Sequence, residues 1–133
     1  MNNLLIIDCS FFLGGLLPDE EGSFDVLAEQ DVYVPSIFYL ECINVLKTSL
    51  KRNRLSVESY NEYIHILRHF PLTADRFSST AESLHPLSDI AVKYDLTSYD
   101  ASYLELALRL KGRMATKDQK LIEACQTAGV LLL

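Results

Sequence analysis

The sequence predicts an α/β fold in which a short parallel sheet is covered by helices on both faces. Continuous apolar runs such as Leu4–Ile7 are typical of strands that are buried on both sides. Stretches with apolar residues at helical spacing, such as 56–70, separate these runs. Strands that alternate with helices form parallel sheets. With 133 residues, 49% of them hydrophobic, we expect one domain over 1–133 with a single core.

The first half of the chain is expected to contain two strands and two long helices. Pro35 closes the second strand, and Ser56 is placed to begin the second long helix. In order, the expected elements are a strand at 4–7, a short helix with a loop over 9–22, a helical turn or two near 23–30, a strand at 32–34, a helix over 36–50, a basic turn at 51–54 and a helix over 56–70.

Glycine, proline and a capping pattern set the expected boundaries in the second half. Pro86 should break or restart a helical stretch, and Gly112 and Gly129 suit positions just beyond helix ends. Thr116 with Gln119 has the spacing of a capping box. In order, we expect a strand at 70–74, a helical stretch over 78–94, a helix from Ser98 to Gly112, a strand at 113–116, a helix over 118–128 and a last strand at 130–133.

Charge and cysteine content narrow the class of protein. The net charge of -6 argues against a protein that coats nucleic acid through a basic surface, although an enzyme could meet a polyanion through bound metal. The three cysteines cannot all pair and none has zinc-site spacing, so we interpret them as buried thiols in a reducing compartment. Asp8 interrupts the first apolar run before it could serve as a signal or a membrane span. A soluble cytoplasmic protein is expected.

The helix over 98–110 carries an acid where a core residue is expected. On the helical wheel, Ser102, Glu105 and Arg109 share the side that should face solvent. The residues expected on the core side are Tyr103, Leu104, Ala107 and Leu108. Asp100 falls on this core side, which requires an explanation.

Two further acids follow predicted strands. Asp8 comes directly after the first strand, at the edge of a parallel sheet where ligands bind, although a lone Asp more often caps the next turn. Asp118 lies two residues past the strand at 113–116, where an acid also complements the helix dipole. The side chain of Asp118 shares a helix face with Ile122 and Cys125, so the dipole alone does not explain its direction.

A fourth acid, Glu41, lies within a helix that is apolar in almost every direction. Glu41, Asn44 and Thr48 form one narrow polar stripe, which could be a buried hydrogen-bonded ladder. A buried Glu without a cationic partner is rare, and no Lys or Arg lies within one turn on the stripe.

A bound divalent cation would explain why four acids occupy such positions. Four like charges in one crevice would repel and raise one another's pKa values. Mg²⁺ and Mn²⁺ prefer oxygen ligands, and no His or Cys is spaced to compete for the ion. We therefore expect Mg²⁺ or Mn²⁺ to bind among Asp8, Glu41, Asp100 and Asp118.

Four motifs in the chain resemble a known family. The stretches "LLIIDCS", "PSIFYLECINVL", "LTSYDASYLELA" and "MATKDQKLIEA" occur in the order found in the PIN-domain ribonucleases, and they are most similar to the toxins of VapBC-type toxin–antitoxin pairs. The resemblance implies a PIN-like three-layer sandwich and a metal-dependent endoribonuclease, usually dimeric and inhibited by a small antitoxin. The middle of the chain, 51–95, matches only in outline.

The resemblance also assigns residues. It places the acidic metal site on Asp8, Glu41, Asp100 and Asp118, the same four acids that the pattern selects. The polar positions that it places around this site are Ser10, Asn44 and Thr116. The proposed chemistry is hydrolysis of an RNA phosphodiester by one or two metal ions.

Two other functions remain open at this stage. A phosphotransfer domain of receiver or haloacid-dehalogenase type also places acids at strand ends, but the latter would need an Asp where the chain has Ser10. A non-catalytic interaction module of the same fold is the other alternative. Such a module would normally have lost one of the four acids, and this chain keeps all of them.

Basic residues offer two routes for RNA phosphates. The Glu41 stripe continues to Lys51 and Arg52, with Arg54 just beyond the helix end, although a basic last turn is also favoured by the helix dipole. The second group is Arg109, Lys111, Arg113 and Lys117. The apolar residues that could form a dimer interface, an antitoxin groove or plain core are Tyr60, Tyr63, Ile64 and Leu67.

Overall fold

The computed structural model describes residues 2–14 and 27–133, which contain a four-stranded parallel sheet. Its strands are β1 (Leu4–Ile7), β2 (Asp31–Pro35), β3 (Thr73–Asp75) and β4 (Arg113–Ala115), in the order β3-β2-β1-β4. Leu5 of β1 pairs with Val32 on one side and with Arg113 on the other. The predicted α/β class and parallel sheet are confirmed.

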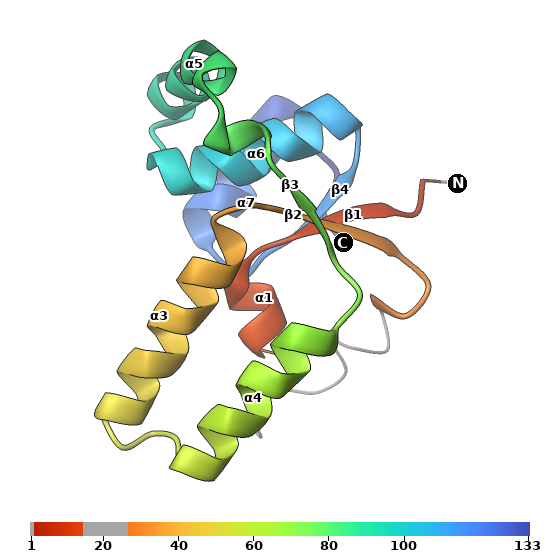
Figure 1. The fold of residues 1–133 in the computed structure, drawn as a ribbon. Helices are drawn as coiled ribbons and strands as arrows, with labels where there is room; N and C mark the ends of the chain where they lie inside the picture. Colours follow the sequence, from red (N-terminus) through yellow and green to blue (C-terminus); the bar gives the residue numbers. More distant parts are fainter. Residues whose placement is uncertain (1, 15–26) are drawn as a thin grey trace.

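Two groups of helices flank the sheet (Figure 1). The first group is α1 (Cys9–Gly14), α3 (Phe38–Lys51) and α4 (Val57–His69), in which α3 contacts both other helices. The second is α5 (Leu84–Tyr94), α6 (Ser98–Leu110) and α7 (Gln119–Ala128), in which α6 contacts α5, α7 and the two central strands. Two short 3₁₀ turns, η1 (Phe77–Ser79) and η2 (Ala81–Ser83), precede α5.

The core forms on both faces of β1. Leu5, Ile6 and Ile7 are fully buried, as a strand between two helical layers requires. On one side, the Phe12 ring of α1 packs edge-on against Phe38 and Phe70, with ring centroids 5.8 Å and 5.2 Å apart. The continuous apolar run at the start of the chain therefore forms a fully packed central strand, as predicted.

The predicted solvent-facing side of α6 is wrong. Ser102 is 4% exposed and Glu105 is 7% exposed. Arg109 bonds to Glu105 Oε2 through Nε at 2.8 Å and to Asp75 Oδ1 through Nη2 at 2.7 Å. This pairing joins α6 to the edge strand β3 and makes burial of Glu105 tolerable. Leu108, expected in the core, is 39% exposed.

Several helix ends differ from expectation. Lys111, not Gly112, takes the left-handed conformation after α6, with φ of 56°. A larger residue would be crowded at Gly112, because a Cβ there would lie 2.5 Å from the Leu4 side chain and 3.2 Å from the Leu4 carbonyl oxygen. Asp118, not Thr116, caps α7 by accepting a hydrogen bond from the Leu121 amide. The expected capping box is therefore absent from α7.

Other boundaries agree with the sequence more closely. The Ser56 hydroxyl accepts a hydrogen bond from the Ser59 amide and begins α4, and Gly129 ends α7 with φ of 81°. Pro86 lies in the first turn of α5, where its missing N–H costs no helical bond. The expected last strand is reduced to one bridge between Leu132 and Met114.

The loop and helical turns expected between α1 and β2 fall mainly on 15–26, which lie outside the described residues. Within the described ranges, no helix has the length and apolar character needed to cross a membrane.

Candidate active site

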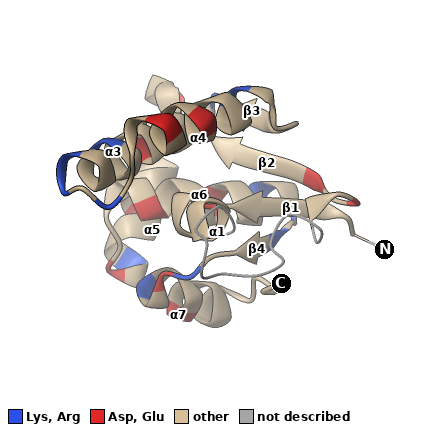
Figure 2. Cartoon of the chain, turned by 90° about the horizontal axis from the view of Figure 1, so that it is seen from below, with Lys and Arg blue, Asp and Glu red and all other residues tan. Residues whose placement is uncertain are grey.

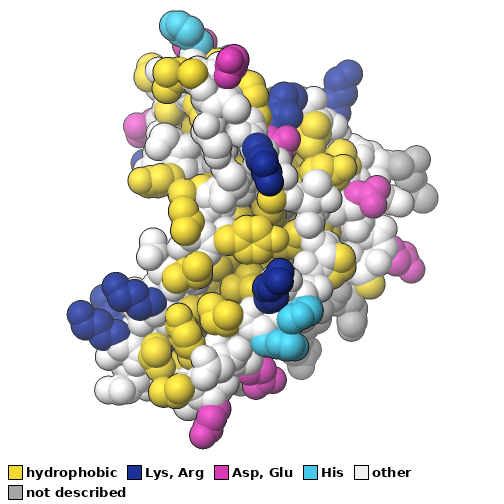
Figure 3. Space-filling model, in the orientation of Figure 1, with side chains coloured by type: hydrophobic (Ala, Val, Ile, Leu, Met, Phe, Trp, Pro, Cys, Tyr) yellow, Lys and Arg dark blue, Asp and Glu magenta, His cyan; other side chains and the backbone are white. Residues whose placement is uncertain are grey.

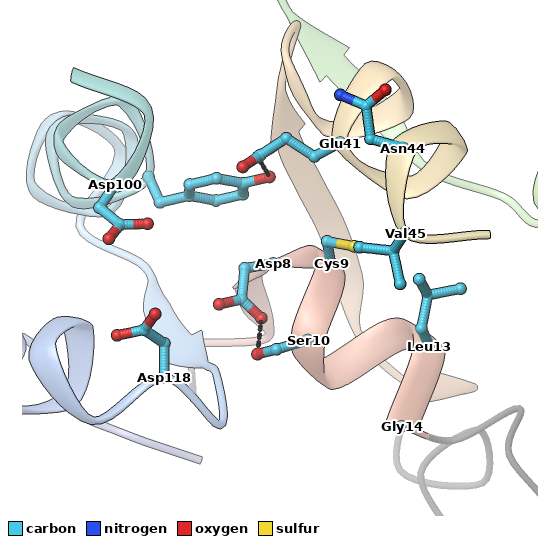
Figure 4. Close-up of a pocket in the computed structure, with 11 residues that line it drawn as sticks. Asp8, Cys9, Ser10, Leu13, Gly14, Glu41, Asn44, Val45, Asp100 and Asp118 are labelled. Atoms are coloured by element: carbon cyan, nitrogen blue, oxygen red, sulfur yellow. Dashed lines mark hydrogen bonds between the residues drawn. The ribbon is translucent and has the colours of Figure 1, made fainter. Parts of the chain in front are cut away.

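A cavity of about 540 Å³ opens at the carboxyl ends of the strands and brings the four predicted acids together. Asp8 follows β1, Asp118 precedes α7, Glu41 comes from α3 and Asp100 from α6. Figure 4 shows the four carboxylates around this space, with Ser10 and Asn44 also on its lining. Residues separated by more than 100 positions therefore meet because parallel strands end at one edge of the sheet.

Asp8 is the most deeply held of the four acids, with 6% of its surface exposed. Its Oδ1 accepts hydrogen bonds from the Ser10 hydroxyl at 2.7 Å and from the Phe11 amide at 3.0 Å. Its Oδ2 accepts a hydrogen bond from the Thr116 hydroxyl. Burial raises the pKa of Asp8 above its usual value, although these three donors oppose the shift.

Ser10 and Thr116 also join the ends of two neighbouring strands. The Lys117 amide donates to the Ser10 hydroxyl at 3.0 Å, and the Asp118 amide donates to the Thr116 hydroxyl at 3.0 Å. The two hydroxyls thus support Asp8 and fix the start of the segment that carries Asp118. Of the three residues selected for supporting roles, Ser10 and Thr116 bond to Asp8, and Asn44 lines the cavity.

Glu41 is half-buried and has a partner that the sequence reasoning missed. The Tyr103 hydroxyl donates to Glu41 Oε1 at 2.6 Å. Burial raises the pKa of Glu41, and the bond from Tyr103 opposes that shift. Tyr103 was placed only among the core residues of α6; the signal that could have revealed it is its position three residues after Asp100, on the same helix face.

Asp100 and Asp118 complete the acidic lining. Burial, together with the charges of Asp118, Glu41 and Asp8, raises the pKa of Asp100 to about 6, and Lys120 partly offsets this shift. Asp118 has a second task, since its Oδ1 caps α7 through the Leu121 amide at 3.1 Å. Asp118 therefore lies at the start of a helix, as the dipole explanation requires, and lines the cavity as well.

Comparison with known proteins identifies the family. The model of the PIN domain family matches residues 5–126. The chain belongs to the PIN domain family. This confirms the resemblance based on the four motifs. Among characterised proteins, Ribonuclease VapC3 of Pyrobaculum aerophilum is 27% identical over 122 residues, which cover 90% of this chain and 92% of the relative.

Solved structures share the PIN fold at low sequence identity. PAE2754 from Pyrobaculum aerophilum matches with a TM-score of 0.70 and 20% identity, over 90% of this chain and 78% of that one. FitAcB from Neisseria gonorrhoeae matches with a TM-score of 0.66 and 16% identity, over 97% of this chain and 96% of that one. Mycobacterium tuberculosis VapC20, a sarcin-ricin loop cleaving toxin, matches with a TM-score of 0.69 and 14% identity, over 97% of this chain and 98% of that one. These likenesses confirm the architecture.

The donor set of the PIN-domain cavity suits a hard divalent cation. Its described lining includes four carboxylates, the Asn44 amide and the Ser10 hydroxyl, and no Lys or Arg. Burial and mutual repulsion already raise the pKa of three of these carboxylates, which a cation would reverse. Within 2–14 and 27–133, however, no three of the acids lie close enough together to encircle an ion as they stand.

The predicted RNA-binding residues lie outside this cavity. Lys51 is the last residue of α3, and Arg52 and Arg54 follow it in the turn before α4; all three are exposed. They form the basic end of the α3–α4 pair in Figure 2. Ten residues separate Lys51 from Glu41, which places the turn about 15 Å farther along the helix.

Part of the second basic group is engaged in the fold. Arg109 forms its ion pairs with Glu105 and Asp75, and Arg113 donates to the Gln30 side chain at 2.8 Å. These two side chains hold secondary structure elements together. They are therefore poorer candidates for phosphate contacts than the exposed turn.

The apolar residues of α4 divide between core and surface. Leu67 is buried, whereas Tyr60, Tyr63 and Ile64 are half-buried against the core. Ile64 and Leu67 also line a groove of about 420 Å³ with residues of α3. Figure 3 shows apolar side chains gathered over this part of the molecule.

Proposed function

We propose that this PIN-domain chain is a divalent-metal-dependent endoribonuclease, the toxin of a toxin–antitoxin pair. The observation that carries the proposal is the cavity at the carboxyl edge of the sheet, which four carboxylates from four separate segments line together. The relative VapC3 is named a ribonuclease, and VapC20 is described as a toxin that cleaves the sarcin-ricin loop. PIN membership and the single Asp at the first strand favour this activity over phosphotransfer.

In this proposal Asp8, Glu41, Asp100 and Asp118 hold Mg²⁺ or Mn²⁺. When bound, the metal would polarise the phosphoryl group and lower the pKa of a water molecule that attacks it. Ser10 and Thr116 keep both oxygens of Asp8 in a fixed orientation through their hydrogen bonds. Asn44 offers an amide donor and acceptor to the substrate from the α3 side of the cavity.

The RNA would leave the cavity along α3. Asn44 and Thr48 are exposed on the same helix face as Glu41, and Lys51, Arg52 and Arg54 lie at its far end. A chain that is acidic as a whole would thus offer phosphates one local basic contact beyond the metal.

The proposed partners are an antitoxin and a second copy of the chain. FitAcB and a toxin–antitoxin complex from Klebsiella pneumoniae share this fold, the latter with a TM-score of 0.57 and 13% identity. Large apolar side chains on α3, among them Leu40 and Ile43, are 58% and 43% exposed and would suit such interfaces. We place the protein in the cytoplasm, because its three cysteines are free and buried.

The decisive experiment is RNA cleavage by the purified protein with Mn²⁺ and with EDTA. We expect cleavage that requires the metal and that Asp8→Asn reduces by orders of magnitude in a folded protein. Cleavage that persists in EDTA and in the Asp8→Asn variant would show that the activity belongs to another nuclease.

A non-catalytic PIN module is the second candidate, because no three acids in the described ranges are grouped tightly around one point. A thermal melt separates the two candidates. A rise in Tm with Mn²⁺ that each single Asp→Asn or Glu→Gln change abolishes supports the nuclease site. No rise in the parent protein supports the module.

A further inference from the structure

We propose that Tyr103 is a positioning residue of this site, whose hydroxyl holds the Glu41 carboxylate from within the protein core. The inference rests on the proposed function, which assigns Glu41 to the metal. The bond from Tyr103 Oη to Glu41 Oε1 measures 2.6 Å and joins residues 62 positions apart. Figure 4 marks it by the dashed line at Glu41.

The two ends of this hydrogen bond differ in how firmly the fold holds them. Tyr103 is 1% exposed and lies between other buried residues of α6. Glu41 is half-buried on α3, whose buried residues are Phe38, Cys42 and Leu46. A glutamate has a long side chain that loses much rotational freedom when it is fixed. Because Tyr103 is held rigidly in the core, its hydroxyl orients the Glu41 carboxylate before a metal binds.

The chemistry of the bond suits a supporting role. Tyr103 donates and Glu41 accepts through Oε1, which leaves Oε2 for a ligand in the cavity that Glu41 lines. A tyrosine hydroxyl is protonated at neutral pH, so the phenol is the donor of this bond. A neutral donor keeps the negative charge of Glu41 available to a cation.

The arrangement gives α6 two contributions to the cavity. Asp100 supplies a carboxylate, and Tyr103, one turn later, fixes the carboxylate that comes from α3. The separation of the two acids is thereby set by one buried helix and one hydrogen bond. We infer that loss of the hydroxyl leaves the cavity intact but lets Glu41 move.

Tyr103→Phe tests the inference, because it keeps the buried ring and removes only the hydroxyl. We expect Mn²⁺ affinity, measured by calorimetry on the folded protein, to fall about tenfold, as for other residues that orient metal ligands. Tyr99→Phe is the matched control. Tyr99 belongs to the same helix, is 56% exposed and lines a different cavity, so Mn²⁺ affinity should not change.

A double-variant cycle shows whether Tyr103 acts through Glu41. In a Glu41→Ala background, Tyr103→Phe should cause no further loss of Mn²⁺ affinity. An equal tenfold loss in that background would mean that the hydroxyl acts through the fold at large, and the inference would be wrong. Unchanged affinity in the single Tyr103→Phe variant would also overturn it.

Crystal structures of the metal-free parent and Tyr103→Phe proteins provide a readout that needs no metal. We expect the Glu41 carboxylate to leave its position or lose order in the variant, and a carboxylate that stays in place would contradict the inference. If Glu41 moves but the parent protein neither binds Mn²⁺ nor cleaves RNA, the positioning role stands and the proposed function fails.

Discussion

Helices α3 and α6 each contribute an acid to the same cavity, yet the fold holds them in different ways. On α6, all residues over 101–107 are buried, including Ser102 and Glu105. On α3, which is one residue longer, the buried residues are Phe38, Cys42 and Leu46. The α6 side of the candidate site is therefore part of the core. The α3 side packs on the core through one line of buried residues.

The apolar content of a helix alone does not reveal how deeply it is buried. Both helices are rich in apolar residues, but Leu104 of α6 is fully buried and Leu40 of α3 is 58% exposed. Sheet strands and two other helices surround α6, whereas α3 contacts mainly α1 and α4. The apolar residues left exposed on α3 are available for a partner.

The largest expected effect comes from the acid on the buried helix. Asp100→Asn should reduce RNA cleavage at saturating Mn²⁺ at least a hundredfold, or about 2.7 kcal/mol of barrier, because it removes a charged ligand. The metal-free variant should be as stable as the parent or more stable, since repulsion with three neighbouring acids is lost.

Initial cleavage rates and urea denaturation in EDTA measure the two parts of this prediction. If Asp100→Asn instead destabilises the metal-free protein by more than about 2 kcal/mol, Asp100 is a structural hydrogen-bonding residue and not a metal ligand.

The same substitution on the two helices measures how differently they are packed. Leu104→Ala on α6 should lower the free energy of unfolding by about 2–5 kcal/mol, because it opens a cavity in the core. Leu40→Ala on α3 should change it by less than about 0.5 kcal/mol. Urea denaturation of both variants gives the two values, and similar losses would mean that α3 and α6 are packed equally tightly.

The pH dependence of stability tests the raised pKa of Asp100 on α6. The pKa of Asp100 is raised to about 6 in the folded protein from an ordinary value of 3.8, so the folded state binds more protons between these two values. The stability of the metal-free protein should therefore be highest at low pH on account of this group and fall as pH rises through about 6.

Unfolding free energies in EDTA at pH 4.5, 5.5 and 7 test this sign, with Asp100→Asn as the control. The variant should show a shallower fall over the same range. A parent protein whose stability rises across this window would require partners for Asp100 that lower its pKa.

The smallest expected effect is at the far end of α3. The double variant Lys51→Ala and Arg52→Ala should weaken RNA binding across sequences and reduce its salt dependence by roughly one unit of slope per lost phosphate contact. Its Mn²⁺ affinity should match that of the parent, because the turn lies well away from the four acids. If the salt dependence of RNA binding by the double variant equals that of the parent, the RNA binds elsewhere on the protein. Lys117 is then the next residue to replace.

Local patterns predicted the parts of the fold that depend on neighbours in sequence. The buried run at β1, the Ser56 cap and the Gly129 helix end are examples. The sequence also predicts where the four acids lie relative to the strand ends and the helix faces. Parallel strands must end at one edge, so the meeting of Asp8 with Asp118 followed from topology.

Pairing across long separations could not be predicted. The helical wheel assigned Glu105 to solvent because it contains no information about Asp75, which lies 30 positions earlier and shares Arg109 with it. The Tyr103–Glu41 bond was hidden for the same reason. The sequence predicts Gly112 as a helix-end glycine, and its close approach to Leu4 is a long-range contact that the local pattern does not reveal.

The hydrogen bonds around Asp8 also bear on when the cavity can form during synthesis. Asp8 is synthesised before its partner Thr116, which follows 108 residues later. At about 5–20 residues per second, this interval lasts at least several seconds. Until β4 pairs with β1, the nascent chain lacks both Thr116 and Asp118 at the sheet edge. The finished cavity can therefore form only after the segment that carries Thr116 and Asp118 has been made.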